Sequence, residues 1–300
     1  MIYLKKICMP SIMAETSFIN AENRTCFSSM YPFKIFPEKG ISVFDFDTIT
    51  ILYGTNGSGK STLINVLSAL VGATRYSDFN DSPFFSDYVN MCYPSYIRRP
   101  DKAMVLTSDD VFDYSLTARD VNDRLSSKRD ELFQKYVDVH NQAANDHSIL
   151  NLRGIDDYAR WAEVTEILST KTSQSKFIKK RVARDVDLHS NGETAMNYFM
   201  ERIDDSALYL LDEPENSLSI ELQIRLADYI AATARATASQ FIIATHSPIL
   251  LSMAGAKIYD LDAYPARICN WTELPNVRRY FDFFKSHEAE FIKKESKKTK

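Results

Sequence analysis

A glycine-rich segment, GTNGSGKST at residues 54–62, combines residue types that bind phosphate. Glycine lets the backbone approach a ligand closely and adopt positive φ angles without strain. The segment matches the pattern G-x-x-x-x-G-K-[ST], whose backbone amides and following helix donate hydrogen bonds to phosphate oxygens. Lys60 adds a positive charge for the β- and γ-phosphates of a triphosphate, and the Ser61 hydroxyl suits Mg²⁺. The residues expected to contact the phosphates are Gly54, Thr55, Asn56, Gly57, Ser58, Gly59, Lys60, Ser61 and Thr62.

Two acidic residues follow a second apolar run, in LYLLDE at residues 208–213. Asp212 is placed to hold Mg²⁺ through water, and Glu213 is placed to polarise an attacking water molecule. The alternative is that adjacent acids only stabilise the N-terminus of a following helix. We predict that Asp212 and Ser61 are metal ligands and that Glu213 is catalytic.

A histidine, His246, ends the next apolar run, FIIATH at residues 241–246. A lone histidine is usually structural, but the carboxyl ends of neighbouring strands are where α/β proteins bind ligands. We therefore predict that His246 hydrogen-bonds a γ-phosphate or the attacking water. The predicted catalytic residues are then Lys60, Glu213 and His246.

The apolar runs predict strands that are joined through helices, which is typical of a parallel sheet buried on both faces. Residues 1–53 are β-rich, and residues 73–100 are expected to form an irregular loop region. A helix is expected to start at DDVFDY (residues 109–114), and residues 117–184 are polar and helical with a break near Gly154. Further strands are expected at residues 48–54 and 103–108 and in the runs 207–215 and 240–248, which are apolar and end in polar residues, and helices are expected at residues 61–70 and 220–236.

Composition restricts the class of protein. The chain has 300 residues, of which 45% are hydrophobic and 25% charged, as in globular proteins. No apolar run approaches the roughly 18 residues of a membrane span, and the first residues lack the apolar region of a secretory signal, so a cytoplasmic protein is expected. The net charge of −4 argues against a chain coated by nucleic acid, although a local basic patch stays compatible with it.

Taken together and in this order, GTNGSGKST, LYLLDEPENSLS and FIIATHSP resemble ABC-type ATPases of the SMC-like branch. Two further segments, YPFKIF and SQFIIATHSPILLSMAGAKIYDLD, are similar to small stand-alone members of that branch, which are labelled AAA-family ATPases. The resemblance covers residues 31–75 and 186–265 and is weak over 76–185. It implies an α/β fold, a P-loop NTPase of ABC type with a mixed sheet core. We expect a single domain over residues 1–300, with a helical insertion subdomain at 76–188.

The resemblance also implies a homodimer closed around ATP and Mg²⁺, in which a serine-glycine segment reaches the γ-phosphate of the opposite subunit. DLHSNGET (residues 187–194) is the candidate, with Ser190 and Gly192 as nucleotide-binding residues. Asn191 replaces the usual first glycine, and Ser190 with Glu193 would also suit a helix N-cap. The interface loop after the acid pair departs from the family near Ser219, where an aspartate is common.

The sequence leaves the roles of three residues open. Where the family carries a glutamine, this chain has LTSDDVF, so Asp109 is either a Mg²⁺ ligand or part of a helix cap. Adenine would stack on Phe36 or Phe33, unless both are core residues.

A basic helix face is predicted from Lys176, Lys180 and Arg184, spaced four residues apart. It suits DNA, although an acidic protein favours the reading of a solvated face. The expected function is an ATPase, linked to DNA repair or phage defence, that works with a partner protein encoded nearby and has DNA or RNA as a candidate ligand. The alternatives are the ATP-binding subunit of an ABC transporter or a nucleotide-dependent switch without significant turnover.

Overall fold

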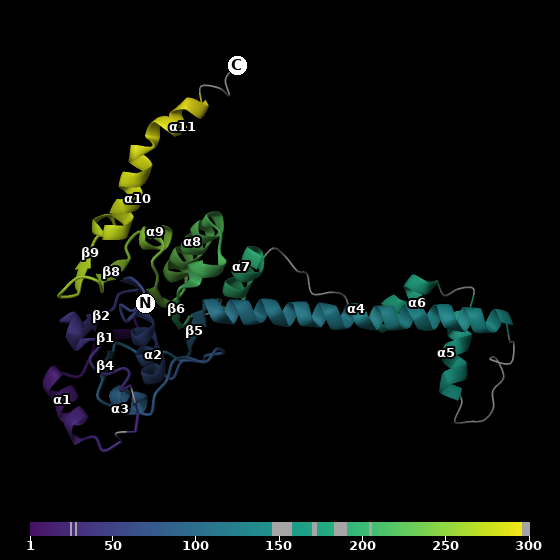
Figure 1. Ribbon diagram of the computed structural model, residues 1–300, viewed down its shortest axis with the longest axis horizontal. Helices are drawn as coiled ribbons and strands as arrows, with labels where there is room; N and C mark the ends of the chain where they lie inside the picture. Colours follow the sequence, from purple (N-terminus) through teal and green to yellow (C-terminus); the bar gives the residue numbers. More distant parts are fainter. Residues whose placement is uncertain are drawn as a thin grey trace. The chain divides into compact units, whose positions relative to one another are not determined.

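The computed structural model describes residues 1–24, 26–27, 29–145, 158–169, 173–182, 191–203 and 206–295. Two compact units are present, Met1–Phe112 with Asn191–Lys300, and Asp113–Ser190 (Figure 1). The second unit begins at Asp113, whereas the sequence placed the start of a helical insertion at residue 76. The assignment of one domain with an insertion stays a prediction.

The first unit is built on a six-stranded sheet with the strand order β5-β6-β7-β3-β8-β9. All neighbouring strands are parallel except β8 and β9, which makes the sheet mixed. Strands β3, β5 and β7 are buried along their whole length, as expected for a parallel sheet covered on both faces. The predicted fold class, a mixed α/β core, is confirmed. The strands are β3 Ile49–Tyr53, β5 Ala103–Thr107, β6 Leu208–Asp212, β7 Gln240–Ala244, β8 Lys257–Asp260 and β9 Arg267–Cys269.

A smaller antiparallel sheet, with the order β2-β1-β4, supplies the β-rich edge expected from the N-terminal third. Its strands are β1 Leu4–Cys8, β2 Val43–Asp45 and β4 Tyr93–Tyr96. The buried side chain of Gln240 joins β1 to the larger sheet, because it accepts hydrogen bonds from the amides of Tyr3 and Leu4 at 2.9 Å each. The same amide group donates to the Leu4 carbonyl at 2.9 Å.

The irregular region predicted for residues 73–100 was wrong in part. It contains α3 (Phe85–Asn90) and the edge strand β4, which pairs with β1. Proline is tolerated at a sheet edge because it has no amide to donate there, so Pro94 does not prevent pairing. Aromatic side chains of this region, including Phe84 and Tyr88, are fully buried in the main core.

Two helices of the first unit pack against the large sheet. α2 (Lys60–Val71) packs against β5, β6 and β7, and α8 (Ile220–Ala236) packs against β7. α2 begins after Gly59 and ends at Gly72, both with positive φ angles of 93° and 65°. The remaining helical elements are α1 Ile12–Ala21, η1 Pro37–Lys39, α7 Asn191–Arg202, η4 Pro214–Ser217, α9 Pro248–Leu251, η5 Trp271–Glu273, α10 Pro275–Ser286 and α11 Glu288–Glu295.

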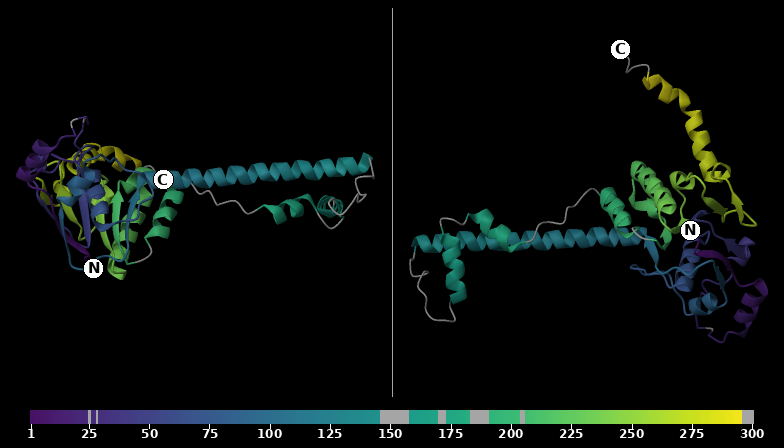
Figure 2. Two further views of the ribbon diagram at one scale, coloured as in Figure 1. Left: turned by 90° about the horizontal axis from the view of Figure 1, so that it is seen from below. Right: turned by 180° about the vertical axis from the view of Figure 1, so that it is seen from behind.

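The second unit is helical. It contains most of α4 (Ser108–Asn145) together with α5 (Tyr158–Leu168) and α6 (Gln174–Arg181), which lies alongside α4 (Figure 2). The sequence suggested a new helix start at residue 109 and a polar helix from 117, but the structure has one helix of 38 residues because no glycine or proline interrupts it. The small apolar core of this unit comprises Leu132, Val139, Val164, Ile167 and Phe177. Over the whole described chain, no helix combines the length and the apolar character needed to cross a bilayer.

Candidate active site

The glycine-rich loop connects β3 to α2, and at Gly54 and Gly59 a side chain would meet close neighbours. A Cβ atom on Gly54 would lie 2.4 Å from the Ser58 hydroxyl oxygen. Gly59 has a φ of 93°, and a Cβ there would lie 2.9 Å from a methyl carbon of Ile35. Gly59 is also the N-cap of α2 and provides no side-chain cap, so the first amides of this helix are left for an anion.

Lys60 lies folded over this loop. Its ammonium group donates to the Gly54 carbonyl at 2.8 Å and lies 3.4 Å from a carboxylate oxygen of Glu213. The Lys60 side chain is only 3% exposed, whereas that of Glu213 is 25% exposed. A buried ammonium needs a partner of opposite charge, and here that partner is the predicted catalytic acid, which stands 153 positions further along the chain.

Asp212 ends β6 opposite the first turn of α2. The Ser61 hydroxyl donates to an Asp212 carboxylate oxygen at 3.1 Å. Burial, together with the neighbouring charge of Glu213, raises the pKa of Asp212 to about 6 against the effects of Ser61, Lys60 and Arg75. The surrounding side chains therefore compensate the negative charge of the Asp212 carboxylate poorly, and a cation bound beside it would be stabilised.

The Ser61 hydroxyl and the Asp212 carboxylate fit a Mg²⁺ ion that accompanies a nucleotide. Mg²⁺ is usually bound through one or two carboxylates, phosphate oxygens and several waters, rather than by a cage of protein ligands. Among the described residues there is no cluster of three or more histidine, cysteine, aspartate or glutamate side chains that could form such a cage. The donor set thus agrees with the nucleotide-bound type of magnesium site.

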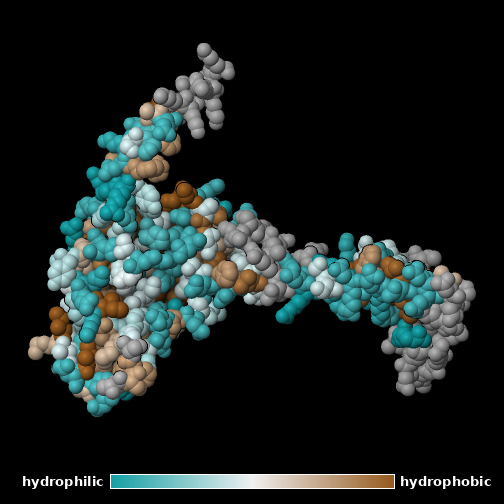
Figure 3. All heavy atoms as spheres, in the orientation of Figure 1, coloured by the Kyte–Doolittle hydropathy of each residue, from teal (hydrophilic) through white to brown (hydrophobic). Residues whose placement is uncertain are grey.

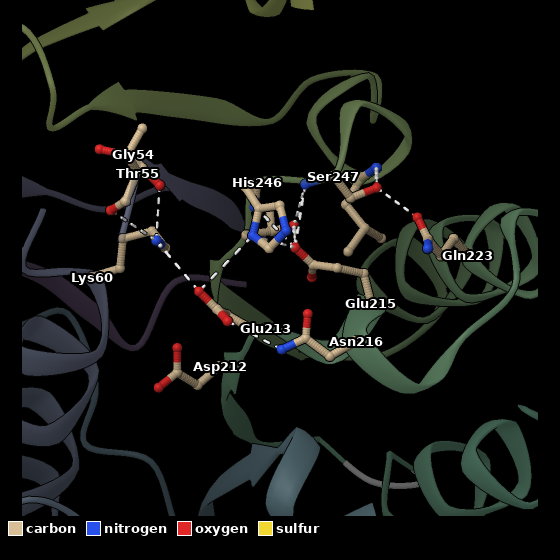
Figure 4. Close-up of polar contacts among 12 residues, drawn as sticks. Gly54, Thr55, Lys60, Asp212, Glu213, Glu215, Asn216, Gln223, His246 and Ser247 are labelled. Atoms are coloured by element: carbon tan, nitrogen blue, oxygen red, sulfur yellow. Dashed lines mark hydrogen bonds and ion pairs between the residues drawn. The ribbon is translucent and has the colours of Figure 1, made fainter. Parts of the chain in front are cut away.

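Glu213 adopts an unusual backbone conformation, with a φ of 49° in the left-handed region. Its amide donates to the Ala244 carbonyl at 2.9 Å, and the Asn216 side chain donates to its carboxylate at 3.1 Å. The imidazole of His246 lies 3.9 Å from the same carboxylate, so Lys60, Glu213 and His246 converge at one edge of the sheet (Figure 4). Strained non-glycine residues of this kind concentrate at functional sites, because surrounding contacts must maintain them.

Glu215 is a residue of the site that the sequence analysis did not single out. One of its carboxylate oxygens accepts hydrogen bonds from the Thr245 hydroxyl at 2.6 Å and from the His246 and Ser247 amides at 2.9 and 3.2 Å. The His246 imidazole lies 3.3 Å from the same oxygen. Glutamate is rarely buried without a partner, yet Glu215 is 6% exposed. The sequence feature that could have pointed to Glu215 is its position two residues after Glu213, in the segment DEPE.

The residue after His246, Ser247, is also held in place by hydrogen bonds. The Ser247 hydroxyl donates to the Gln223 side chain at 2.7 Å and caps the first turn of α9, accepting from the Ile249 amide at 3.2 Å. Glu215 and Gln223 together therefore hold the backbone on both sides of the His246 side chain (Figure 4).

Asp262 is a second residue that sequence reasoning missed. Its carboxylate accepts from the Thr55 amide at 2.8 Å and from the Thr55 hydroxyl at 3.1 Å. Asp262 follows β8, the strand beside β3, so it supports the phosphate loop from the neighbouring strand end.

Thr107 and Asp110, and not Asp109, form a capping box at the start of α4: the Thr107 hydroxyl accepts from the Asp110 amide at 3.1 Å, and the Asp110 carboxylate accepts from the Thr107 amide at 2.8 Å. Asp109 is exposed in the first turn of α4, and its role as a metal ligand stays a prediction. Phe33 stacks on Phe18 with ring centroids 4.7 Å apart.

Phe36 is likewise a core residue, since it is 1% exposed and packs edge-on against Phe44. The buried positions of Phe33 and Phe36 favour the core-packing alternative over adenine stacking.

Ser190 of the serine-glycine segment lies outside the described residues. Gly192 and Glu193 follow in the first turn of α7. A role for Ser190 and Gly192 at a second nucleotide site stays a prediction.

The basic face is partly engaged within its own unit. Lys180 forms an ion pair with Glu166 at 2.9 Å, and Arg181 contacts the same carboxylate at 2.6 Å. Arg184 lies outside the described residues. The pairing of Lys180 supports the interpretation of a solvated helix face, and DNA binding through Lys176, Lys180 and Arg184 stays a prediction.

A phosphate loop after β3, an acid pair after β6 and a histidine after β7, on a mixed sheet with helices on its faces, define a P-loop ATPase of the ABC and SMC kind. The chain belongs to the family described as "AAA domain, putative AbiEii toxin, Type IV TA system", whose model matches residues 91–252.

Among solved structures, this chain matches the Smc head domain with an extended coiled coil from Pyrococcus furiosus, bound to the C-terminal domain of ScpA. It is 14% identical, with 94% of this chain and 100% of that chain covered and a TM-score of 0.42. The SMC head domain from Thermotoga maritima is 15% identical, with 89% and 98% covered and a TM-score of 0.38. A comparison with curated proteins gives no match.

Asp212→Asn is expected to stabilise the metal-free protein by about 1–3 kcal/mol, because a neutral amide avoids the cost of burying a carboxylate. The same variant should lose most of the stabilisation that Mg²⁺ and ATP together give the wild type. Thermal unfolding with and without these ligands measures both effects.

Asp260→Asn is the matched control, because Asp260 is a buried carboxylate that accepts from the Asp262 and Ala263 amides and should not be stabilised by the change. A metal-free Asp212→Asn protein that unfolds more easily than the wild type would contradict this account of the site.

Proposed function

We propose that this protein binds ATP with Mg²⁺, hydrolyses it, and forms a homodimer around the bound nucleotide. The observation that carries the proposal is the convergence of Lys60, Glu213 and His246 beside the hydrogen-bonded pair of Ser61 and Asp212. These residues come from two strand ends, those of β6 and β7, and from the start of helix α2, and each has the chemistry that phosphoryl transfer to water requires.

Each of these residues has a separate role in the proposed hydrolysis. The loop amides and Lys60 bind the phosphates, while Ser61 and Asp212 hold Mg²⁺, which neutralises phosphate charge when it is bound. In this structure the Lys60 ammonium lies 3.4 Å from the Glu213 carboxylate. When Lys60 turns to the phosphates, the Glu213 carboxylate loses this partner and is free to accept a proton from the attacking water.

His246 would hydrogen-bond the γ-phosphate or the attacking water. The imidazole is 47% exposed, so it is accessible to a substrate, while its backbone is held by Glu215. This combination of a fixed backbone and an accessible ring suits a group that must meet a ligand in one geometry.

We further propose that the ATPase works in a DNA-linked or phage-defence system in the cytoplasm, with a partner protein encoded nearby and with DNA or RNA as a candidate ligand. The sequence resemblance to SMC-like ATPases supports the link to DNA. The description of the matching family, which refers to a toxin of a type IV TA system, supports a role in defence.

The homodimer is tested by Ser190→Arg, which should keep ATP binding to the monomer within about threefold of wild type while abolishing nucleotide-dependent dimerisation and turnover. A bulky cation in a segment that reaches the opposite subunit blocks closure without touching the monomer's own phosphate loop. Equilibrium ATP binding, gel filtration with Mg²⁺ and ATP, and phosphate release are measured on the same samples.

Ser126→Arg, at an exposed position of α4, is the control and should behave as wild type. If Ser190→Arg weakens monomer binding as severely as Lys60→Ala does, the segment acts within its own subunit and the composite site is wrong.

A further inference from the structure

The two C-terminal helices, α10 and α11, carry a set of large apolar side chains that are open to solvent. Figure 1 shows both helices at the end of the first unit, and Figure 3 shows hydrophobic residues among hydrophilic ones along them. Each side chain of the set is between 53% and 60% exposed. The set, which we name the aromatic face, comprises Tyr280, Phe281, Phe283, Phe284, Phe291 and Ile292.

These side chains form one continuous surface rather than scattered exceptions. Tyr280 and Phe281 follow the buried Val277 by three and four residues, and Phe284 follows them by four and three, so all of them share a side of α10. The Phe284 ring lies 5.6 Å from that of Phe283 and 6.3 Å from that of Phe291, so the surface continues onto α11. A contiguous apolar patch of this kind marks an interaction site.

A groove of about 600 Å³ adjoins this surface between α10 and the elements α8 and α9. Its apolar lining includes Ile220, Ile249, Trp271, Tyr280, Phe281 and Phe284. A second hollow of about 590 Å³ lies on another side of α10 and shares Tyr280 and Phe284 with the first. Aromatic rings brought along α10 by another helix would therefore find space on both of its sides.

We propose that the aromatic face binds the same face of a second copy of this chain, with the α10–α11 segments antiparallel. The charges along the segment carry this choice of occupant. Arg278 and Arg279 lie near its beginning, and Glu288 and Glu290 lie ten and eleven residues further on. An antiparallel pair related by a two-fold axis near Phe283 and Phe284 brings the arginine end of each copy to the glutamate end of the other.

A parallel pair would instead place like charges side by side, which is unfavourable. Within the part of the chain that the structure describes, these four side chains form no ion pairs with other residues, so their charges are available to a second copy. Arg278 lies over the Phe281 ring, 5.7 Å from its centroid, which holds the guanidinium beside the aromatic face.

The available area agrees with a specific dimer of modest affinity. An aromatic side chain buries about 150–250 Å², so six half-exposed side chains offer about 600 Å² per copy. Two copies would bury about 1,200 Å² in total, at the lower end of the range for stable interfaces. The contact uses no residue of the phosphate loop, so we expect it to form without nucleotide, unlike the ATP-dependent dimer.

Charge reversal tests the pairing directly. One variant combines Arg278→Glu and Arg279→Glu, and the other combines Glu288→Lys and Glu290→Lys. Each variant alone should dissociate at least about 30-fold more readily than the parent, because like charges then meet at both ends of the two-fold pair. An equimolar mixture should recover association, since every altered charge of one variant faces an attracting charge of the other.

The measurement is sedimentation equilibrium of the full chain without nucleotide, in the Lys60→Ala background so that an ATP-dependent dimer makes no contribution. A matched control reverses two exposed arginines of α8, Arg225→Glu with Arg235→Glu, and should associate like the parent.

A parent protein that stays monomeric at 100 µM, at about 3.4 mg/ml for a 34.3 kDa chain, overturns the proposal. The proposal is equally overturned if both variants associate like the parent, which would assign self-association to another surface. Failure of the mixture to recover association would also overturn it, and would leave the aromatic face to a different kind of protein.

Discussion

Glu213→Gln should yield a protein that still binds ATP and Mg²⁺ but hydrolyses ATP at least about 100-fold more slowly than the wild type, the usual scale for loss of a general base. The amide keeps the size of the side chain but cannot accept a proton from water. ATP-bound dimers should then accumulate, because hydrolysis no longer separates them. Phosphate release and gel filtration with Mg²⁺ and ATP measure the two effects together.

Glu221→Gln makes the same chemical change at an exposed position in the first turn of α8 and should leave turnover unaltered. The assignment of Glu213 would be wrong if its glutamine variant stayed monomeric with nearly normal turnover. The strained backbone at Glu213 is unchanged by this substitution, so a loss of activity reports on the carboxylate and not on the fold.

Glu215→Leu is expected to destabilise the protein by about 2–4 kcal/mol and to lower kcat by about 10- to 100-fold with little change in the affinity for ATP. Leucine removes the acceptor for the Thr245 hydroxyl and for two backbone amides, so those buried donors lose their partner. The backbone at His246 is then no longer fixed. Denaturant unfolding and steady-state kinetics measure the stability and the rate.

Glu215→Gln is the informative comparison, because its side-chain oxygen can accept the same three hydrogen bonds. We expect it to retain most of the stability and most of the rate. Equal losses in the leucine and glutamine variants would show that the negative charge of Glu215 matters, and an unaltered kcat in the leucine variant would contradict its role in positioning His246.

The local parts of this protein were predictable from sequence. Gly59 and Gly72 set the start and end of α2, since both need positive φ angles, and apolar runs gave the buried strands of the large sheet. The helix predicted at 220–236 agrees with α8. These features depend on backbone preferences and on periodicity within about ten residues, which the sequence displays directly.

Longer-range features could not be predicted in the same way. The edge strand β4 reads as a loop because YPSY is short and contains proline, and only pairing with β1 makes it a strand. Phe33 and Phe36 could equally have stacked on a ligand, and the packing of α1 and β2 against them decides that they are core residues.

The sequence by itself determined which residues can perform phosphate chemistry and that each follows a strand or begins a helix. Tertiary structure alone decided which of them meet. Strand β3 lies between β7 and β8 and not beside β5 or β6, and this order brings Lys60 to Glu213 and sets Asp262 beneath the phosphate loop. The backbone at His246 is likewise fixed by a tertiary contact, the hydrogen bond from its amide to the buried carboxylate of Glu215. Such contacts join residues 31 to 207 positions apart, and their energy depends on burial and sheet order, which no local pattern encodes.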